Sequence, residues 1–273
     1  MRSRVSIGVA VVAVILCAGY ALSSWGGGDE PPGAPVAAGA PAYEGHMLAA
    51  GTKVGEAPRC AAGAIRPVRE PGASMAALLI RPTTARRKPG GTTISSFGLV
   101  NVNGVRTVFG VLDERLAADC RASWLRVQLP IRPNGSVGWV RSRDVRRFKV
   151  ATRVTVDLSE RNVTVMQGDR EVLSVDAAIG KPATPTPTGR FYVNQRLLAS
   201  DPTGPWGPGG VGVSAFSPVL QDWAQGGPIA IHGTNTPQLI GSAVSNGCVR
   251  ISNFHLRQLM RLAPEGTPVV IRA

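Results

Sequence analysis

Short runs of β-forming residues, separated by glycine, proline or asparagine, fill most of the chain after residue 75. In one of these runs Leu125, Val127 and Leu129 alternate with polar residues, which is the pattern of a half-buried strand. Helical periodicity is confined to the stretch 253–262. The 33 Gly and 22 Pro residues supply many turns, whereas aromatic residues make up only 5% of the chain. The pattern therefore predicts a mainly β protein and argues against a helical bundle.

The N-terminus carries a long apolar run. Arg2 and Arg4 precede Val5–Leu22, eighteen residues without a charged side chain. A basic start followed by such a run is typical of a signal peptide or a single membrane anchor, which we place at residues 1–25. Residues 26–72 are rich in Gly and Pro and are predicted to form a linker. We therefore expect an exported protein that is either secreted or membrane-anchored.

The net charge of +13 is concentrated in the first half of the chain. Residues 1–150 hold 20 Lys and Arg against nine Asp and Glu, whereas residues 151–273 hold 10 against eight. This excess reflects either a compositional bias of the surface or an attraction to an anionic partner. Because an exported protein does not meet DNA or RNA, we expect no nucleic-acid partner. The candidate partners are anionic wall polymers or a membrane surface.

Residues 73–149 are predicted to form a small β domain. Its five expected strands are Ala76–Ile80, Thr93–Phe97, Arg106–Leu112, Trp124–Leu129 and Val137–Val140. The block WLRVQLPIRPNGSVGWVRSRDV, with a hairpin turn at 133–136, resembles the last hairpin and closing turn of a bacterial SH3-like barrel. The resemblance implies an SH3-like domain, a module that binds or positions other groups and rarely catalyses.

A second block, residues 150–273, begins as a β-meander with two turns. Its strands follow the period-two alternation of apolar residues, and its helix follows the 3.6-residue period. The predicted elements are strands at 154–158, 163–165, 172–175 and 269–271, and a helix at Asn253–Leu262 with Ser252 or Asn253 as its N-cap.

The segment 229–253, IAIHGTNTPQLIGSAVSNGCVRISN, holds the residues best suited to catalysis. His232 ends an apolar strand, and Cys248 follows it sixteen residues later among turn formers. A cysteine becomes nucleophilic near neutral pH when an imidazole or a positive charge stands beside it. The backbone N–H groups of Gly247 and Cys248 can stabilise an oxyanion during acyl transfer. Composition alone leaves a buried structural cysteine as the alternative.

Histidine and cysteine are too few and too scattered for a zinc or haem site. The chain has three His and four Cys, and neither a CxxC nor an HExxH spacing occurs. We therefore expect neither a metal nor a cofactor.

The same segment resembles the signature of the L,D-transpeptidase (YkuD-type) family, in which a His-Gly strand end is followed by Ser-His-Gly-Cys-x-Arg. Upstream, TPTGRFYV at Thr186–Val193 is similar to the Thr-Pro-x-Gly-x-Phe segment of that family. The resemblance implies a YkuD-type β-sandwich with a short helix, with a cysteine nucleophile, a histidine base and a backbone carbonyl that orients the base. The matching positions are His232, Gly233, Gly241, Ser245, Gly247, Cys248 and Arg250, with Gly233 supplying the carbonyl.

One position departs from the family pattern, because Asn246 stands where a second histidine is usual. The resemblance gives the base role to the first histidine, which matches His232, so the departure is compatible with activity. The Asn246 amide can still donate or accept a hydrogen bond. We expect Ser245, Asn246 and Arg250 to contact substrate, with bracing of the site as an equal alternative for Arg250.

The reaction that the resemblance implies cross-links the stem peptides of peptidoglycan. The Cys248 thiolate attacks a tetrapeptide stem, expels its terminal D-alanine and forms a thioester, which an amine of a neighbouring stem then attacks. An L,D-carboxypeptidase, in which water replaces the amine, and a non-catalytic wall-binding protein are the alternatives. The protein would act in the cell wall, with the SH3-like domain as a spacer.

The cysteine count predicts one disulfide. Outside the apolar N-terminal run the chain has Cys60, Cys120 and Cys248, and an odd number in an exported chain leaves one thiol unpaired. Catalysis requires Cys248 to be that thiol, which favours a bridge between Cys60 and Cys120. Two separate buried thiols are the alternative.

Overall fold

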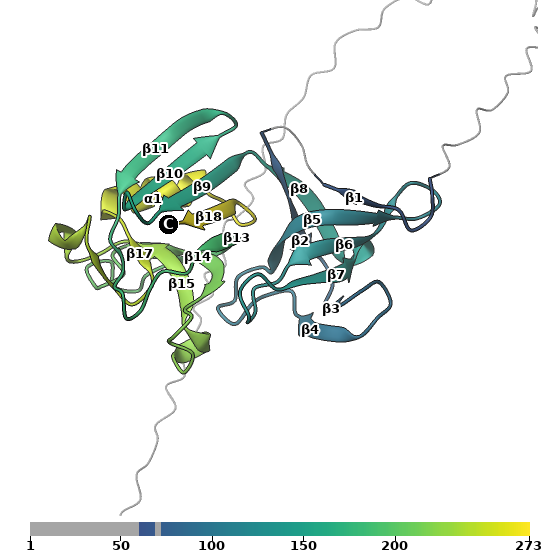
Figure 1. Ribbon diagram of the computed structural model, residues 1–273, viewed down its shortest axis with the longest axis horizontal. Coiled ribbons are helices and arrows are strands. Elements are labelled where there is room, and N and C mark those ends of the chain that lie inside the picture. The colour runs from purple at the N-terminus through teal and green to yellow at the C-terminus, as the bar shows by residue number, and fades with distance from the viewer. Residues whose placement is uncertain (1–59, 69–71) are drawn as a thin grey trace, which may run out of the picture. The chain divides into compact units, whose positions relative to one another are not determined.

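The computed structural model describes residues 60–68 and 72–273, which fall in one compact unit (Figure 1). The apolar N-terminal run and most of the expected linker lie outside the described residues. Within the described part of the chain, no helix has the length and apolar character needed to cross a membrane. The protein is mainly β, as predicted. Its elements are β1 (Ile65–Pro67), β2 (Ser74–Leu79), β3 (Thr83–Arg86), β4 (Thr93–Phe97), β5 (Val108–Leu116), β6 (Ala122–Gln128), β7 (Val137–Arg141), η1 (Ser142–Asp144), β8 (Val145–Val150), β9 (Thr152–Asp157), β10 (Asn162–Gln167), β11 (Arg170–Asp176), β12 (Ile179–Gly180), β13 (Gly189–Leu198), β14 (Gly209–Phe216), η2 (Ala224–Gly226), β15 (Pro228–His232), η3 (Pro237–Leu239), β16 (Ala243–Ser245), β17 (Val249–Arg250), α1 (Asn253–Leu262) and β18 (Pro268–Arg272).

The first eight strands form what we call the N-terminal sheet domain. They pair in the order β4-β3-β7-β6-β5-β2-β8, with β1 also on β5, and every neighbouring pair is antiparallel. A separate apolar core, which includes the fully buried Phe109 and Leu125, supports the sheet. All five expected strands are present within a few residues of their predicted bounds. The SH3-like character of the domain stays a prediction.

A disulfide joins Cys60 to Cys120, with 5.0 Å between the two Cα atoms. It joins the entry segment to the turn between β5 and β6, and it is the pairing that the cysteine count favours. Among the described residues Cys248 is the free cysteine, which leaves its thiol available for chemistry.

The second half of the chain, in which catalysis is predicted and which we call the catalytic half, is built on a second path of eight strands, β11-β10-β9-β18-β13-β14-β15-β17. The long strand β13 turns this path into two layers. Its first part, Gly189–Tyr192, pairs with β18, and its second part, from Val193 onward, pairs with β14, with a register shift between Val193 and Gln195. A strand that switches sheets at a bulge makes the corner of a sandwich. A short sheet of β12 and β16 stands beside this path.

Helix α1 covers this core, and its bounds match the prediction. Leu256 and Leu259 of the helix are fully buried in the core of the sandwich. Ser252 is the N-cap, because its hydroxyl accepts a hydrogen bond from the backbone N–H of His255 at 3.2 Å. The ring of His255 therefore stays at the start of the helix, bonded to the capping hydroxyl at 2.9 Å.

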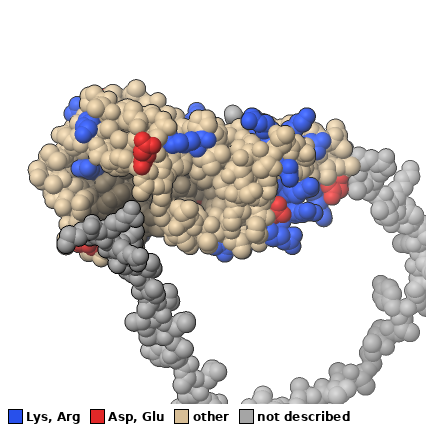
Figure 2. Space-filling view, turned by 90° about the horizontal axis from the view of Figure 1, so that it is seen from below, with Lys and Arg blue, Asp and Glu red and all other residues tan. Residues whose placement is uncertain are grey.

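Basic residues gather over the N-terminal sheet domain. Figure 2 shows this concentration on the right of the molecule, and only scattered blue residues over the catalytic half. The excess of positive charge predicted for the front half thus lies in a folded domain. Contacts such as the hydrogen bond from Gln128 Nε2 to the Arg190 carbonyl, 2.9 Å long, join that domain to the catalytic sheets.

Candidate active site

Two parallel strands bring His232 and Cys248 to one face of the sheet. Strand β15 ends at His232, and β17, which starts one residue after Cys248, pairs with it in parallel with His232 opposite Arg250. The alternate residues Ile231 and Val249 are fully buried in the core. Since side chains alternate along a strand, His232, Cys248 and Arg250 share the opposite face. Cys248 and His232, the predicted nucleophile and base, are thus diagonal neighbours across the two strands.

The His232 imidazole is buried and has a defined tautomer. Its Nδ1 lies 2.6 Å from the carbonyl oxygen of Gly233. Because a carbonyl only accepts hydrogen bonds, Nδ1 carries the proton and Nε2 keeps a free lone pair. The ring is 5% exposed, and burial lowers its pKa to about 4; the Gly233 hydrogen bond opposes this shift, and the Arg250 charge adds a smaller lowering. At neutral pH His232 is therefore a neutral base.

Two neighbours fix the position of this base. The Trp206 indole packs against the imidazole with 4.3 Å between ring centroids. Gly233 lies so close to Asn253, the first residue of α1, that a Cβ there would collide with the Asn253 side-chain oxygen. That oxygen accepts a hydrogen bond from the Thr234 N–H at 2.8 Å. The start of the helix thus braces the strand end that orients the histidine.

The Cys248 side chain rests as a thiol. Burial raises its pKa, and the backbone contact with Ala230 and the Arg250 charge offset this only in part. Its Sγ donates to the Pro228 carbonyl at 3.9 Å. The resting site therefore holds a neutral thiol and a neutral imidazole on one face, an arrangement in which a proton could pass from the thiol to the ring.

The loop before Cys248 is held by Ser245. The Ser245 hydroxyl donates to the Cys248 carbonyl at 2.5 Å and accepts from the Gly247 N–H at 3.1 Å. Ser245 is 1% exposed, so its hydroxyl positions the nucleophile and does not face substrate. The Gly247 N–H, one of the two expected oxyanion donors, is occupied by this bond in the resting site.

The segment at 180–189 braces the same loop from the other side. Thr184 Oγ1 donates to the Ser245 carbonyl at 3.0 Å and lies 3.5 Å from the Asn246 side-chain oxygen. Thr186 Oγ1 accepts from the Gly180 N–H at 2.9 Å. Thr184 therefore supports the loop before Cys248, Thr186 closes its own segment, and Asn246 is exposed at the surface of the loop.

The Arg250 side chain has a buried hydrogen-bond donor, its Nε, whose partner is missing among the described residues. The guanidinium stands on the same face as Cys248 and His232, so an anionic or carbonyl group of a bound molecule would satisfy the donor. This observation favours the substrate-contact role over pure bracing.

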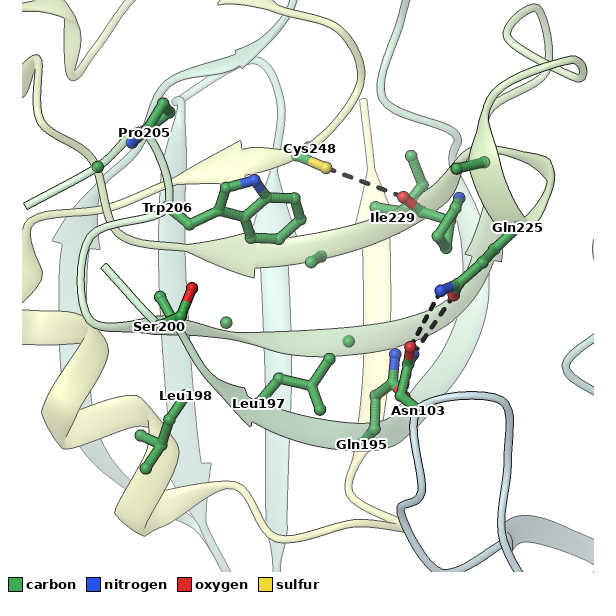
Figure 3. Close-up of a pocket in the computed structure, with 18 of the residues that line it drawn as sticks. Asn103, Gln195, Leu197, Leu198, Ser200, Pro205, Trp206, Gln225, Ile229 and Cys248 are labelled. Carbon is green, nitrogen blue, oxygen red and sulfur yellow. Dashed lines mark hydrogen bonds between the residues drawn. The ribbon is translucent and has the colours of Figure 1, made fainter. Parts of the chain in front are cut away.

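Cys248 opens into a pocket of about 610 Å³ (Figure 3). Its walls are mainly apolar, and they include two tryptophans that are about half exposed, Trp206 and Trp223. Sequence reasoning missed both, although an isolated tryptophan in the Gly- and Pro-rich stretch GPWGPGG was a usable signal. Ser245, Asn246 and Arg250 are not among the residues that line this pocket.

Comparison with known proteins places the catalytic half in one family. Residues 151–271 match the model of the L,D-transpeptidase catalytic domain named YkuD. The protein named L,D-transpeptidase YkuD of Bacillus subtilis is 34% identical over 124 residues, which cover 45% of this chain and 68% of that protein. Its counterpart in Bacillus licheniformis is 37% identical over 119 residues, which cover 44% of this chain and 64% of that protein.

Solved structures of L,D-transpeptidases are also similar. One from Mycobacterium smegmatis is 16% identical with a TM-score of 0.38, and the match covers 55% of this chain and 78% of that one. The identity to the Bacillus subtilis protein, over two thirds of its length, decides the assignment. The chain belongs to the YkuD family of L,D-transpeptidase catalytic domains.

Proposed function

We propose that the protein is a peptidoglycan L,D-transpeptidase that forms cross-links between stem peptides through a thioester on Cys248. The observation that carries the proposal is the pairing, on one strand face, of a free thiol with an imidazole whose Nε2 lone pair is unprotonated. A wall-binding protein without activity has no use for this pair.

In the acylation step the Sγ–H proton passes to His232 Nε2 while sulfur bonds to the carbonyl carbon of the third stem residue. The backbone N–H of Cys248 donates to the developing oxyanion. The Gly247 N–H becomes a second donor once it gives up its hydrogen bond to the Ser245 hydroxyl. The C–N bond to the terminal D-alanine then breaks, and His232 returns its proton to the leaving amine.

In the second step an acceptor amine on a neighbouring stem attacks the thioester. His232 takes a proton from the amine, the C–S bond breaks and the thiol is regenerated. The cleaved peptide bond supplies the energy of the new one through the thioester, so the reaction needs no nucleotide outside the membrane. Because peptidoglycan lies outside the membrane, the protein would be exported and would act in the cell wall. It would be either secreted or anchored through residues 1–25.

Incubation of the purified protein with a disaccharide-tetrapeptide, followed by mass spectrometry, tests the proposal. The expected product is a dimer that lacks one D-alanine. A tripeptide monomer alone would establish the L,D-carboxypeptidase instead. No change in the substrate, with the Cys248→Ala variant behaving identically, would overturn both.

A further inference from the structure

The segment 217–227, which joins β14 to β15, forms one wall of the pocket that holds Cys248. We call it the pocket wall. Most of it is exposed to solvent, and its regular structure is the short turn η2. The residues that line the pocket from this segment are Trp223, Ala224, Gln225 and Gly227.

The backbone at the end of the pocket wall has an uncommon conformation. Gln225, Gly226 and Gly227 have φ values of 58°, 78° and 65°, all in the left-handed region. A residue with a side chain, such as Gln225, rarely adopts this region unless its surroundings hold it there. Something outside the segment must therefore stabilise it.

Arg132 of the N-terminal sheet domain ties both ends of the pocket wall together. Its Nη2 donates to the carbonyl of Ser217 at 2.8 Å and to the carbonyl of Gly226 at 2.6 Å. Its guanidinium also lies over the Phe216 ring, 5.4 Å from the centroid. Hydrogen bonds from a charged donor are stronger than neutral ones, so one side chain fixes the two points where the wall begins and ends.

Asn134, two residues further along, holds the strand that leads into the pocket wall. Its amide donates to the Phe216 carbonyl at 2.8 Å and accepts from the Phe216 N–H at 2.9 Å. The Asn134 side chain thus satisfies both backbone groups of Phe216, as a residue of a neighbouring strand would. The hairpin turn that carries both residues is itself closed by bonds between Ser136 and Pro133, so it presents them from a defined backbone.

A third contact reaches the tip of the wall. The Asn103 and Gln225 side chains bond to each other at 3.0 Å and 3.3 Å (Figure 3). Asn103 also donates to Gln195 of β13, another residue that lines the pocket, at 3.0 Å. Asn103 thus links the pocket wall to strand β13 from outside the catalytic sheets.

We propose that the N-terminal sheet domain shapes the substrate pocket by holding the 217–227 wall, with Arg132, Asn134 and Asn103 as positioning residues. The inference rests on the proposed function for the identity of the bound stem peptide. The domain is then part of the substrate-binding apparatus, beyond its predicted role as a spacer. His232 ends β15 and Cys248 directly precedes β17, two strands that the catalytic core supports, so the loss of these contacts affects binding more than chemistry.

The test compares variants of the full chain. Arg132→Ala and Asn134→Ala should each raise the KM for a tetrapeptide donor, by about tenfold for Arg132→Ala, with kcat changed by less than about threefold. Arg132→Lys, which keeps the charge without the fork of donors, should restore part of the loss. The control is Arg146→Ala, which removes an exposed arginine of the same domain that makes no contact with the pocket wall.

Hydrogen exchange supplies a readout that does not depend on activity. Peptides within 217–227 should exchange faster in Arg132→Ala and Asn134→Ala than in the wild type, while peptides from α1 should be unchanged. If Arg132→Ala proves unfolded by its urea transition, Asn134→Ala carries the test. Unchanged exchange and an unchanged KM in folded variants would overturn the inference. Faster exchange in an enzyme without transpeptidase activity would uphold the wall contacts and refute the proposed function.

Discussion

The low pKa of His232 predicts an acid limit of activity well below the usual histidine range. The general base must be unprotonated, and burial of its ring sets the pKa at about 4. The acylation rate should therefore fall only as the pH drops through about 4, where an ordinary solvated imidazole would lose half its base form at 6.5. His232→Gln should slow acylation by roughly 100-fold or more and remove this acid limb.

The same shift affects the stability of the fold. The pKa of His232 is lower in the folded chain than in the unfolded chain, so between pH 6.5 and about 4 the unfolded state binds more protons. This contribution to stability is complete above pH 6.5 and is lost as the pH falls toward 4. A shift from 6.5 to about 4 corresponds to about 3 kcal/mol of unfolding free energy.

Two measurements check these values. Mass spectrometry of intact protein follows the acylation rate between pH 3.5 and about 8, and urea unfolding gives the free energy over the same range. His232→Gln should flatten the histidine-dependent part of the stability profile, whereas His255→Gln, at the cap of α1, should leave it in place. An acid limb between pH 6 and about 7 would refute the reasoning, because it would mean that His232 is solvated or is not the base.

Three further changes have defined outcomes. Cys248→Ala should abolish acylation while the urea midpoint stays within experimental error of the wild type, and a turnover equal to that of the wild type would exclude the covalent mechanism. Trp206→Ala should hydrate the histidine ring and move the acid limb upward, because burial is the main cause of its low pKa, whereas Trp223→Ala should not move it. Replacement of Cys60 and Cys120 by serine opens a loop with a sequence separation of 60 and should cost about 4 kcal/mol of unfolding free energy in the chain-entropy model; an unchanged urea midpoint would contradict the bridge.

The strands and the helix could be predicted where burial is one-sided. From Leu125 to Gln128, strand β6 alternates buried and partly buried residues, and α1 presents Leu256 and Leu259 to the core, so their patterns are visible in the sequence. Strand β8 is different, because VRRFKV has buried residues only at its two ends. A strand whose middle carries charged side chains has no apolar periodicity to detect.

The chemistry of the site could be predicted, but its surroundings could not. Cys248 and His232 are chemically distinctive, and their segment resembles a known signature. The contacts that tune them come from residues far away in sequence. Trp206 packs on the base from the connection between β13 and β14, and Asn253 reaches Thr234 from the start of α1. Contacts of this kind depend on how sheets close on each other, which no local pattern encodes.

The sixteen-residue spacing of His232 and Cys248 itself has a topological cause. Strands β15 and β17 are parallel, and a parallel pair requires a crossover connection of about a dozen residues or more. Within this connection, β16 pairs with β12 in the two-stranded sheet before the chain reaches β17. An antiparallel hairpin could bring two such residues together across a two-residue turn, but it would leave no room for the Ser245 brace that holds the loop before Cys248. The long spacing is therefore a requirement of a parallel pair whose crossover also carries the support for the reactive cysteine.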